Sequence, residues 1–258
     1  MFANYHTHTW RCKHADENER EYVEQALAAG IRILGFSDHT PYPFPNGYVS
    51  YFRMAPGQAE DYFTTLSDLK REYAGQIDIR IGVEAEYYPE RFQGLLDFLR
   101  DYPCEYMLLG QHYIHNETDG VYSGKATADE AVLIQYVSQV LEGLETGLFT
   151  YVAHPDLIHW QGPEEIGRRE LTRLCRGVKA LGIPLEINLL GLMKHRHYPG
   201  SLFWQIAGEV GCTGILGCDA HQAWALNLPE IEQQGRDLAA KYGIPLLDTA
   251  ELKPILGK

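Results

Sequence analysis

The sequence predicts an α/β barrel made of seven strand–helix units. Seven short apolar runs alternate with segments of helical periodicity, and each run ends on a polar side chain that could bind a metal or a substrate. Because parallel barrel strands finish at one rim, we expect these ends to converge. They lie at residues 4–8, 36–39, 82–86, 110–112, 152–154, 186–188 and 217–221.

The segments between the apolar runs predict helices with definite ends. We expect helices over residues 16–29, 58–74, 90–101, 127–144, 163–181, 199–210 and 229–242. Asp16 with Glu19, and Thr127 with Glu130, have capping-box spacing. Residues 244–247 could form an eighth strand or a tail strand outside the barrel. Residues 40–55 and 113–126 are longer than a strand–helix turn needs, and we expect loops there that build a substrate pocket.

Length and composition fit one large domain over residues 1–258, with 45% hydrophobic residues for its core. The net charge of −13 disfavours nucleic acid, although bound divalent ions would still admit a small anionic substrate. Five cysteines without a CxxC pair indicate a reducing compartment. With neither a signal peptide nor a membrane-length apolar run expected, we predict a soluble, cytoplasmic protein of undetermined oligomeric state.

Imidazoles and carboxylates at one rim predict a metal centre. The pairs His6/His8, Glu84/Glu86 and Asp219/His221 are each two residues apart, so both members point to the same inward face of a strand end. Histidine with Asp or Glu suits Zn, Mn, Fe or Co. A lone histidine is more often a hydrogen-bonded core residue, but this many at strand ends favours metal binding.

The order of these motifs resembles the PHP (polymerase and histidinol phosphatase) family. The resemblance runs from residue 6 to about 222 and is carried by His6-Thr7-His8, His14, Ser37-Asp38-His39, Gly82-Val83-Glu84, His112, His154-Pro155-Asp156 and Asp219-Ala220-His221. The stretches 6–15, 37–41 and 186–188, with Tyr198-Pro199, look most like the monofunctional histidinol-phosphate phosphatases. The resemblance implies a distorted (β/α)7 TIM-like barrel with a metal site at the C-terminal rim of its strands.

The resemblance also implies three divalent metal ions, which would be zinc, manganese or iron. The first ion would be bound by His6, His8, Glu84 and Asp219, the second by His14, His39 and His221, and the third by His112, His154 and the shared Glu84. His14 differs from the others because it falls in a loop. The chemistry of the residues agrees with such a division, since nine ligands are too many for one ion and a carboxylate can bridge two.

Other residues near the rim are expected to act around the metals. Asp38 and Glu86 would orient ligands or receive a substrate ammonium. Arg196 is the candidate for a phosphate contact, because a guanidinium binds phosphate in bidentate fashion. Related phosphatases often carry a second basic group after His-Pro-Asp, but residues 157–161 lack Arg and Lys. A substrate imidazole could stack on Tyr42, Phe44 or Tyr48; Cys12 and Cys218 are expected to pack, and His115, His159, His195 and His197 to lie in solvated loops.

These features favour a metal-dependent phosphatase that hydrolyses L-histidinol phosphate to L-histidinol and phosphate, a step of histidine biosynthesis. The nucleophile would be a metal-bridging hydroxide, because no side-chain nucleophile motif is present; the general acid is not identified. One alternative is another small phosphate ester, such as a nucleotide or a sugar phosphate. Less favoured are an amidohydrolase, since no Lys ends a strand, and a non-catalytic PHP scaffold, since every expected ligand position is filled.

Overall fold

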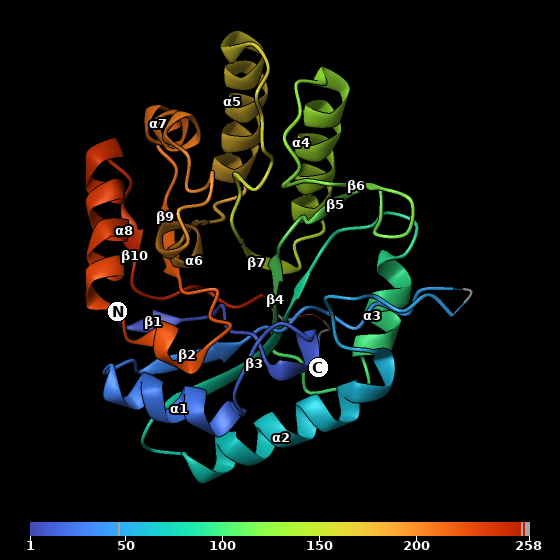
Figure 1. Ribbon diagram of the computed structural model, residues 1–258, viewed down its shortest axis with the longest axis vertical. Coiled ribbons are helices and arrows are strands. Elements are labelled where there is room, and N and C mark those ends of the chain that lie inside the picture. The colour runs from blue at the N-terminus through green and yellow to red at the C-terminus, as the bar shows by residue number, and fades with distance from the viewer. Residues whose placement is uncertain (46, 254, 256–258) are drawn as a thin grey trace.

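Eight strands form one curled sheet in which every neighbouring pair is parallel (Figure 1). A computed structural model describes residues 1–45, 47–253 and 255. In sheet order the strands are β1 (Ala3–Asn4), β2 (Ile33–Phe36), β3 (Asp78–Ala85), β4 (Tyr106–Leu109), β7 (Phe149–Val152), β8 (Leu185–Asn188), β9 (Gly214–Gly217) and β10 (Leu246–Leu247). The predicted α/β, TIM-like fold class is confirmed.

The segments that follow β1 and β9 meet and draw the curled sheet toward closure. Thr7 and Ala220 form an isolated parallel bridge, and the His8 amide donates to the Ala220 carbonyl at 2.9 Å. Strand β10 pairs with the beginning of β9, with Leu246 opposite Gly214. Residues 246–247 therefore form an eighth strand at the sheet edge, whereas seven strand ends surround the rim.

Helices cover the outside of the sheet (Figure 1). Seven correspond to predicted helices: α1 (Glu19–Ala28), α2 (Ala59–Glu72), α3 (Phe92–Leu99), α4 (Glu130–Glu145), α5 (Glu164–Ala180), α7 (Ser201–Val210) and α8 (Pro229–Tyr242). The short helix α6 (Leu189–Met193) and the 3-10 turns η1 (Trp10–Cys12), η2 (Pro56–Gln58) and η3 (Ala223–Leu226) were not predicted. No described helix combines the length and apolar character that crossing a membrane would require.

Both predicted capping boxes are wrong by a few residues. Helix α1 is capped by Asn18, whose side chain accepts from the Glu21 amide at 3.2 Å. The Asp16 amide instead donates to the His221 carbonyl at 2.9 Å, which ties this segment to the rim. Helix α4 is capped by Asp129, because Thr127 is drawn into a bridge with Trp160.

The two long connections pack on the rim side of the barrel. The 113–126 connection is not only a loop, because β5 (Tyr113–Ile114) and β6 (Val121–Tyr122) pair as an antiparallel hairpin. Two-residue strands carry too little periodicity to be recognised in the sequence.

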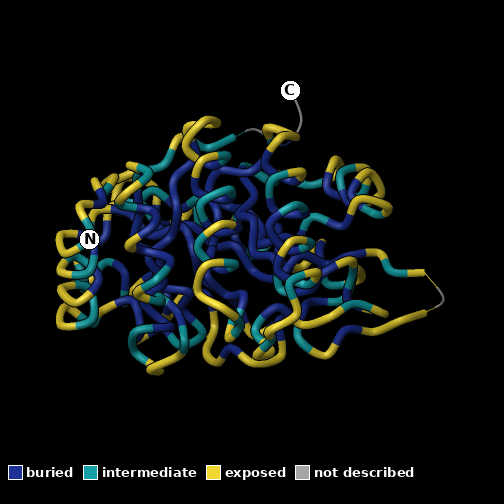
Figure 2. The backbone as a smooth tube through the Cα atoms, turned by 90° about the horizontal axis from the view of Figure 1, so that it is seen from above, coloured by how far each residue is buried: buried dark blue, intermediate teal, exposed yellow. Residues whose placement is uncertain are grey.

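The backbone is mostly buried through the centre of the molecule and exposed around it (Figure 2). There the Tyr106 hydroxyl donates to the Tyr5 carbonyl at 2.7 Å, across the barrel interior.

Candidate metal centre

All nine predicted ligands lie together at the C-terminal rim of the strands. Eight of them follow a strand or lie near its end, and His14 follows the 3-10 turn η1. His6 and His8 come after β1, His39 after β2, His112 after β4, His154 after β7, and Asp219 and His221 after β9. Glu84 is the next-to-last residue of β3. Convergence of parallel strand ends therefore brings together residues that are far apart in sequence, such as His14 and His221, which are 207 positions apart.

Glu84 lies at the centre of the cluster. Its Oε1 atom is 2.8 Å from Nε2 of His154 and 3.5 Å from Nε2 of His112. Its Oε2 atom is 2.9 Å from Nδ1 of His39 and 3.6 Å from Nε2 of His6. The two oxygens thus face different histidines, which is the arrangement of a carboxylate that can bridge neighbouring ions.

His6, His8 and Asp219 form a first group of potential ligands. The Oδ1 atom of Asp219 is 3.0 Å from Nε2 of His8 and 3.6 Å from Nε2 of His6, and all three side chains are buried. Asp219 has a φ of 48° and His154 a φ of 30°, a backbone region that non-glycine residues seldom occupy and that is enriched at functional sites. This group with Glu84 contains the ligands expected for the first ion.

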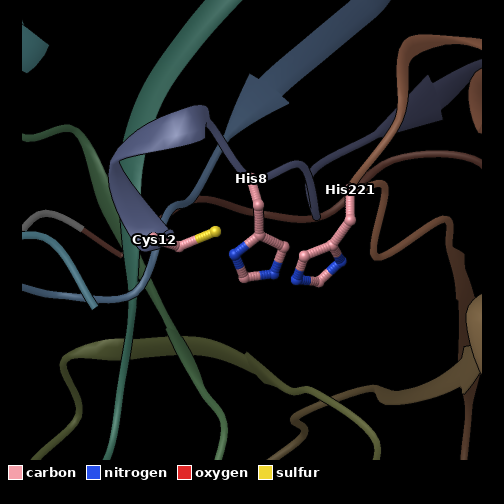
Figure 3. Close-up of side chains that lie close together, drawn as sticks. All are labelled: His8, Cys12 and His221. Atoms are coloured by element: carbon pink, nitrogen blue, oxygen red, sulfur yellow. The ribbon is translucent and has the colours of Figure 1, made fainter. Parts of the chain in front are cut away.

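His14, His39 and His221 form a second group, with ligand atoms within 4.8 Å of one another. The Nε2 atoms of His14 and His221 are 2.9 Å apart. Figure 3 shows the His8 and His221 rings side by side, with ring centroids 4.1 Å apart, and the Cys12 sulfur directed toward His8. Cys12 is fully buried, and burial raises the pKa of its thiol. The side chain is therefore better explained as a packed neutral thiol, as expected, than as a thiolate ligand.

The third group departs slightly from the expected ligand set. His154 joins Glu84 and His6 within 4.8 Å, whereas His112 approaches Glu84 at 3.5 Å from the pocket side. His6 therefore stands between the first and third groups. A metal would fit this centre, because Glu84 Oε2 and His39 Nδ1 are buried and, although 2.9 Å apart, form no aligned hydrogen bond with each other or with another described residue. Buried polar atoms without partners are costly, and a cation would remove that cost at the Glu84 carboxylate and at Nδ1 of His39.

The cluster separates into protonated and neutral histidines when no metal is bound. Burial lowers the pKa of His8, but hydrogen bonds to Asp219 and Asp38 outweigh it and raise the pKa to about 9. Burial and the nearby charge of His8 hold the pKa values of His39 and His221 well below their ordinary value. Glu84 stays ionised, because surrounding imidazoles lower its pKa although burial opposes this. Without metal, the anionic Glu84 is thus balanced by protonated imidazoles such as His8, which a bound metal ion would replace.

Carboxylates behind the ligands fix the imidazole orientations. Asp38 Oδ1 lies 3.3 Å from Nδ1 of His8, and Glu86 Oε1 lies 2.9 Å from Nδ1 of His112. Glu86 is 1% exposed and also pairs with Arg53, so it is not free to receive a substrate ammonium; Asp38 is fully buried as well. The geometry therefore favours the role of orienting metal ligands over that of receiving a substrate ammonium.

Sequence analysis placed Glu186 at a strand end but assigned it no role; in the structure it also orients imidazoles. Its Oε1 atom is 2.8 Å from Nδ1 of His6, and its Oε2 accepts from the His154 amide at 2.9 Å. Asn188, two residues later on β8, donates to Asp219 Oδ2 at 3.1 Å. The available signal was their two-residue spacing, which puts both side chains on the inward face of β8.

A cavity of about 330 Å³ opens directly above the cluster. Arg196 lines it as predicted, and so does Lys194, which was not singled out. Its aromatic wall is Tyr51, Phe52, Tyr113, Tyr122 and Tyr198. The expected stacking residues Tyr42, Phe44 and Tyr48 do not line it: Tyr42 is buried and donates to the Glu86 carbonyl, Phe44 packs on Tyr42, and Tyr48 donates to Glu117. That prediction is wrong because the 40–55 segment folds back and turns these rings away from the pocket.

The remaining histidines and Cys218 lie outside the cluster. His159 and His197 stack on each other with ring centroids 4.0 Å apart, and His197 is anchored to the Leu157 carbonyl at 2.8 Å, so this pair is more structured than two solvated loop residues. His115 and His195 are exposed residues with positive φ. Cys218 is buried, as expected for a packing residue.

Comparison with known proteins agrees with this geometry. A probable histidinol-phosphatase of Deinococcus radiodurans is 28% identical over 228 residues, covering 84% of this chain and 85% of that protein. The histidinol-phosphatase of Bacillus subtilis is 29% identical over 254 residues, covering 84% and 92%. The crystal structure of histidinol phosphate phosphatase from Lactococcus lactis, complexed with zinc, L-histidinol and phosphate, has the same fold, with a TM-score of 0.73 at 20% identity over 96% of this chain and 98% of that one. Residues 4–189 match the PHP domain, and the chain therefore belongs to the PHP family.

Proposed function

We propose that this protein is a metal-dependent phosphatase that hydrolyses L-histidinol phosphate to L-histidinol and phosphate. The observation that carries the proposal is that six residues of the ligand cluster line a cavity whose wall also bears two cations, Lys194 and Arg196; the six are His14, His39, His112, His154, Asp219 and His221. A phosphate monoester needs both features. Membership of the PHP family and similarity to the two histidinol-phosphatases support the choice of substrate.

The cluster would hold three divalent ions in the sets named from the sequence, with zinc, manganese and iron all compatible with the donors. His6, His8, Glu84 and Asp219 would bind one ion, His14, His39 and His221 another, and His112 and His154 with Glu84 the third. Such ions supply an activated water and neutralise phosphoryl oxygens. The protein's own contribution is to fix the imidazoles through Asp38, Glu86 and Glu186.

Lys194 and Arg196 would hold the phosphate from the side opposite the cluster. Both side chains line the cavity, and Lys194 makes no ion pair with any described residue. Arg196 is steadied by donating to the Tyr198 hydroxyl. Residues 157–161 lack the second basic group that related phosphatases often carry, and Leu157 lines the cavity there. Lys194 would supply the second positive charge from another segment.

The aromatic wall would receive the leaving group. Tyr51, Phe52, Tyr113 and Tyr122 offer ring faces on which an imidazole can stack. The cavity volume of about 330 Å³ lies at the lower end of the range for small-ligand pockets, roughly 300–1,000 Å³. A small phosphate ester therefore fits better than a polymer. The five cysteines are free, which accords with a reducing compartment, and we place the enzyme in the cytoplasm.

A phosphate-release panel tests the proposal. The protein loaded with zinc, manganese or iron would be offered histidinol phosphate, nucleoside monophosphates and sugar phosphates at equal concentration. We expect the highest kcat/KM for histidinol phosphate and its loss in Asp219→Asn. A higher kcat/KM for a nucleotide or sugar phosphate would support the alternative substrate, and hydrolysis by Asp219→Asn at the wild-type rate would reject the cluster as the active centre.

A further inference from the structure

Arg53 is a buried cation beside the metal centre that the proposed chemistry does not use. It is 1% exposed, and its guanidinium lies over the Phe52 ring at 4.5 Å from the centroid. All three nitrogens donate: Nε to Glu117 Oε2 at 2.7 Å, Nη2 to Glu86 Oε1 at 2.9 Å and Nη1 to the Thr40 carbonyl at 3.0 Å. A buried charge is tolerated only when it is paired in this way.

The oxygen of Glu86 that accepts from Arg53 also contacts a predicted metal ligand. Oε1 of Glu86 is 2.9 Å from Arg53 Nη2 and 2.9 Å from His112 Nδ1, whereas its Oε2 is buried without a hydrogen-bond partner. The position of Oε1 is therefore set by Arg53. Because His112 donates from Nδ1 to that oxygen, its Nε2 is left free to accept a metal, and it points toward Glu84 at 3.5 Å.

The other arm of Arg53 holds the pocket wall. Glu117 belongs to the connection that carries Tyr113 and Tyr122, and its second oxygen accepts from the Tyr48 hydroxyl at 3.0 Å. Tyr51, two residues before Arg53, shares a hydrogen bond of 2.8 Å with the Tyr113 hydroxyl. The two long connections that supply the aromatic wall are thus joined at Arg53.

We propose that Arg53 is a positioning residue that links the aromatic wall of the pocket to the metal site containing His112. Its guanidinium holds Glu86 next to His112, and it ties the 40–55 connection to the 113–126 connection through Glu117. Lysine cannot replace it, because a single ammonium does not reproduce the fork that spans two carboxylates and a carbonyl. This role rests on the proposed metal-dependent function, but it makes its own prediction about metal binding in the absence of substrate.

The test compares metal affinity and kinetics in three variants. In Arg53→Lys we expect the ion bound through His112 to bind about 10-fold to 100-fold more weakly, as when other partners of metal ligands are removed, with the remaining ions retained. Glu117→Gln cuts only the arm to the loops, so metal content should stay at the wild-type level while KM rises several-fold and kcat changes little. Arg91→Lys is the matched control, because Arg91 also lies 5.8 Å from the Phe44 ring centroid but makes no ion pair with the described residues.

Metal would be counted by mass spectrometry after dialysis and its affinity measured by competition with a chromophoric chelator. Wild-type affinity at every site in Arg53→Lys would overturn the proposal, as would equal metal loss in Glu117→Gln or Arg91→Lys. If Arg53→Lys does not fold, Arg53→Met/Glu117→Gln removes the cation together with one carboxylate and should lose the same single ion. If the wild-type protein binds the ions but does not hydrolyse histidinol phosphate, the proposed function is rejected. The effect of Arg53→Lys on metal affinity can still be measured in that case.

Discussion

Glu186 and His6 form a buried pair in which Oε1 of the carboxylate lies 2.8 Å from Nδ1 of the imidazole. The pair is set behind the metal cluster, since Nε2 of His6 faces Glu84 and Asp219. The second oxygen of Glu186 holds the His154 amide. One strand residue therefore orients two predicted ligands from different strands.

We expect Glu186→Gln to weaken metal binding by about 10-fold to 100-fold, because the imidazole loses the anion that fixes its tautomer and raises its basicity. The side-chain volume is nearly unchanged, so the far-ultraviolet circular dichroism should stay the same. Metal content after dialysis and chelator competition would measure the effect. Glu165→Gln, an exposed site on α5, is the control; wild-type affinity in Glu186→Gln would show that His6 needs no such partner.

Gly110 makes room for the central carboxylate. A methyl group added there would overlap Oε1 of Glu84, and only the Glu84 side chain stands in its way among the nearest atoms. We expect Gly110→Ala to displace Glu84, reduce the number of bound ions and abolish most activity, with the fold kept. Gly94→Ala in α3 is the control, since nothing lies within 4 Å of its added carbon and alanine favours a helix by roughly 0.5–1 kcal/mol. Full metal content in Gly110→Ala would contradict a bridging role for Glu84.

The strand-end ligands could be predicted from the sequence because they depend only on local pattern. An apolar run, a polar residue two positions from another and a parallel sheet together place these side chains on one rim. The roles of Glu186 and Lys194 were not predicted, for different reasons. Glu186 sits within an apolar strand, where its role depends on His6 from 180 residues away. Lys194 follows the unpredicted helix α6, which turns the chain back over the cavity.

Contacts made by long connections were the least predictable part of the site. Proline and aromatic residues in the 40–55 segment marked it as a pocket loop, but which rings face the pocket is decided by tertiary packing. Arg53 pairs with Glu117 across 64 residues, the neighbouring Phe52 lines the cavity, and Tyr42 is buried. Periodicity carries no information about such pairings.

His8 makes the metal-free protein sensitive to pH. Its pKa is raised from 6.5 to about 9, so its contribution to stability is fully present below pH 6.5 and is lost as the pH rises through about 9. Metal binding requires neutral imidazoles at His8 and at His6; burial lowers the pKa of His6, but Glu186, Asp219 and Glu84 raise it well above its ordinary value. The affinity of this site should therefore rise by about tenfold or more per pH unit over that window, with release of one or more protons. Burial and the charge of His8 lower the pKa of His14, so the second site should change less.

Thermal unfolding of the metal-free protein between about pH 6 and pH 9 would show the loss of stability, and calorimetric titration in two buffers of different ionisation enthalpy would count the protons. His8→Asn should make both slopes shallower, and the slope that remains belongs to His6. A melting temperature that rises over this window in the wild type would contradict the raised pKa of His8.

Arg196 and Lys194 should contribute unequally to phosphate binding. Arg196 can form bidentate contacts and is steadied by Tyr198, so Arg196→Ala should raise KM by about 10-fold to 100-fold, the size expected for a hydrogen bond to a charged group of about 1.5–3 kcal/mol. Lys194 is a single ammonium without a side-chain hydrogen bond or ion pair to the described residues, so Lys194→Ala should raise KM only by a few-fold, in line with about 0.2–1 kcal/mol for solvated charges.

Inhibition by inorganic phosphate should weaken in parallel with KM, because the product lacks the leaving group and reports on the phosphate contacts alone. Arg196→Lys keeps the charge but not the fork, so its KM should lie between those of wild type and Arg196→Ala. Lys241→Ala, exposed on α8 far along the chain from the cavity residues, controls for net charge. Unchanged phosphate inhibition in Arg196→Ala would mean that the cluster alone holds the phosphoryl group, and the cationic wall would then act only on the encounter with substrate.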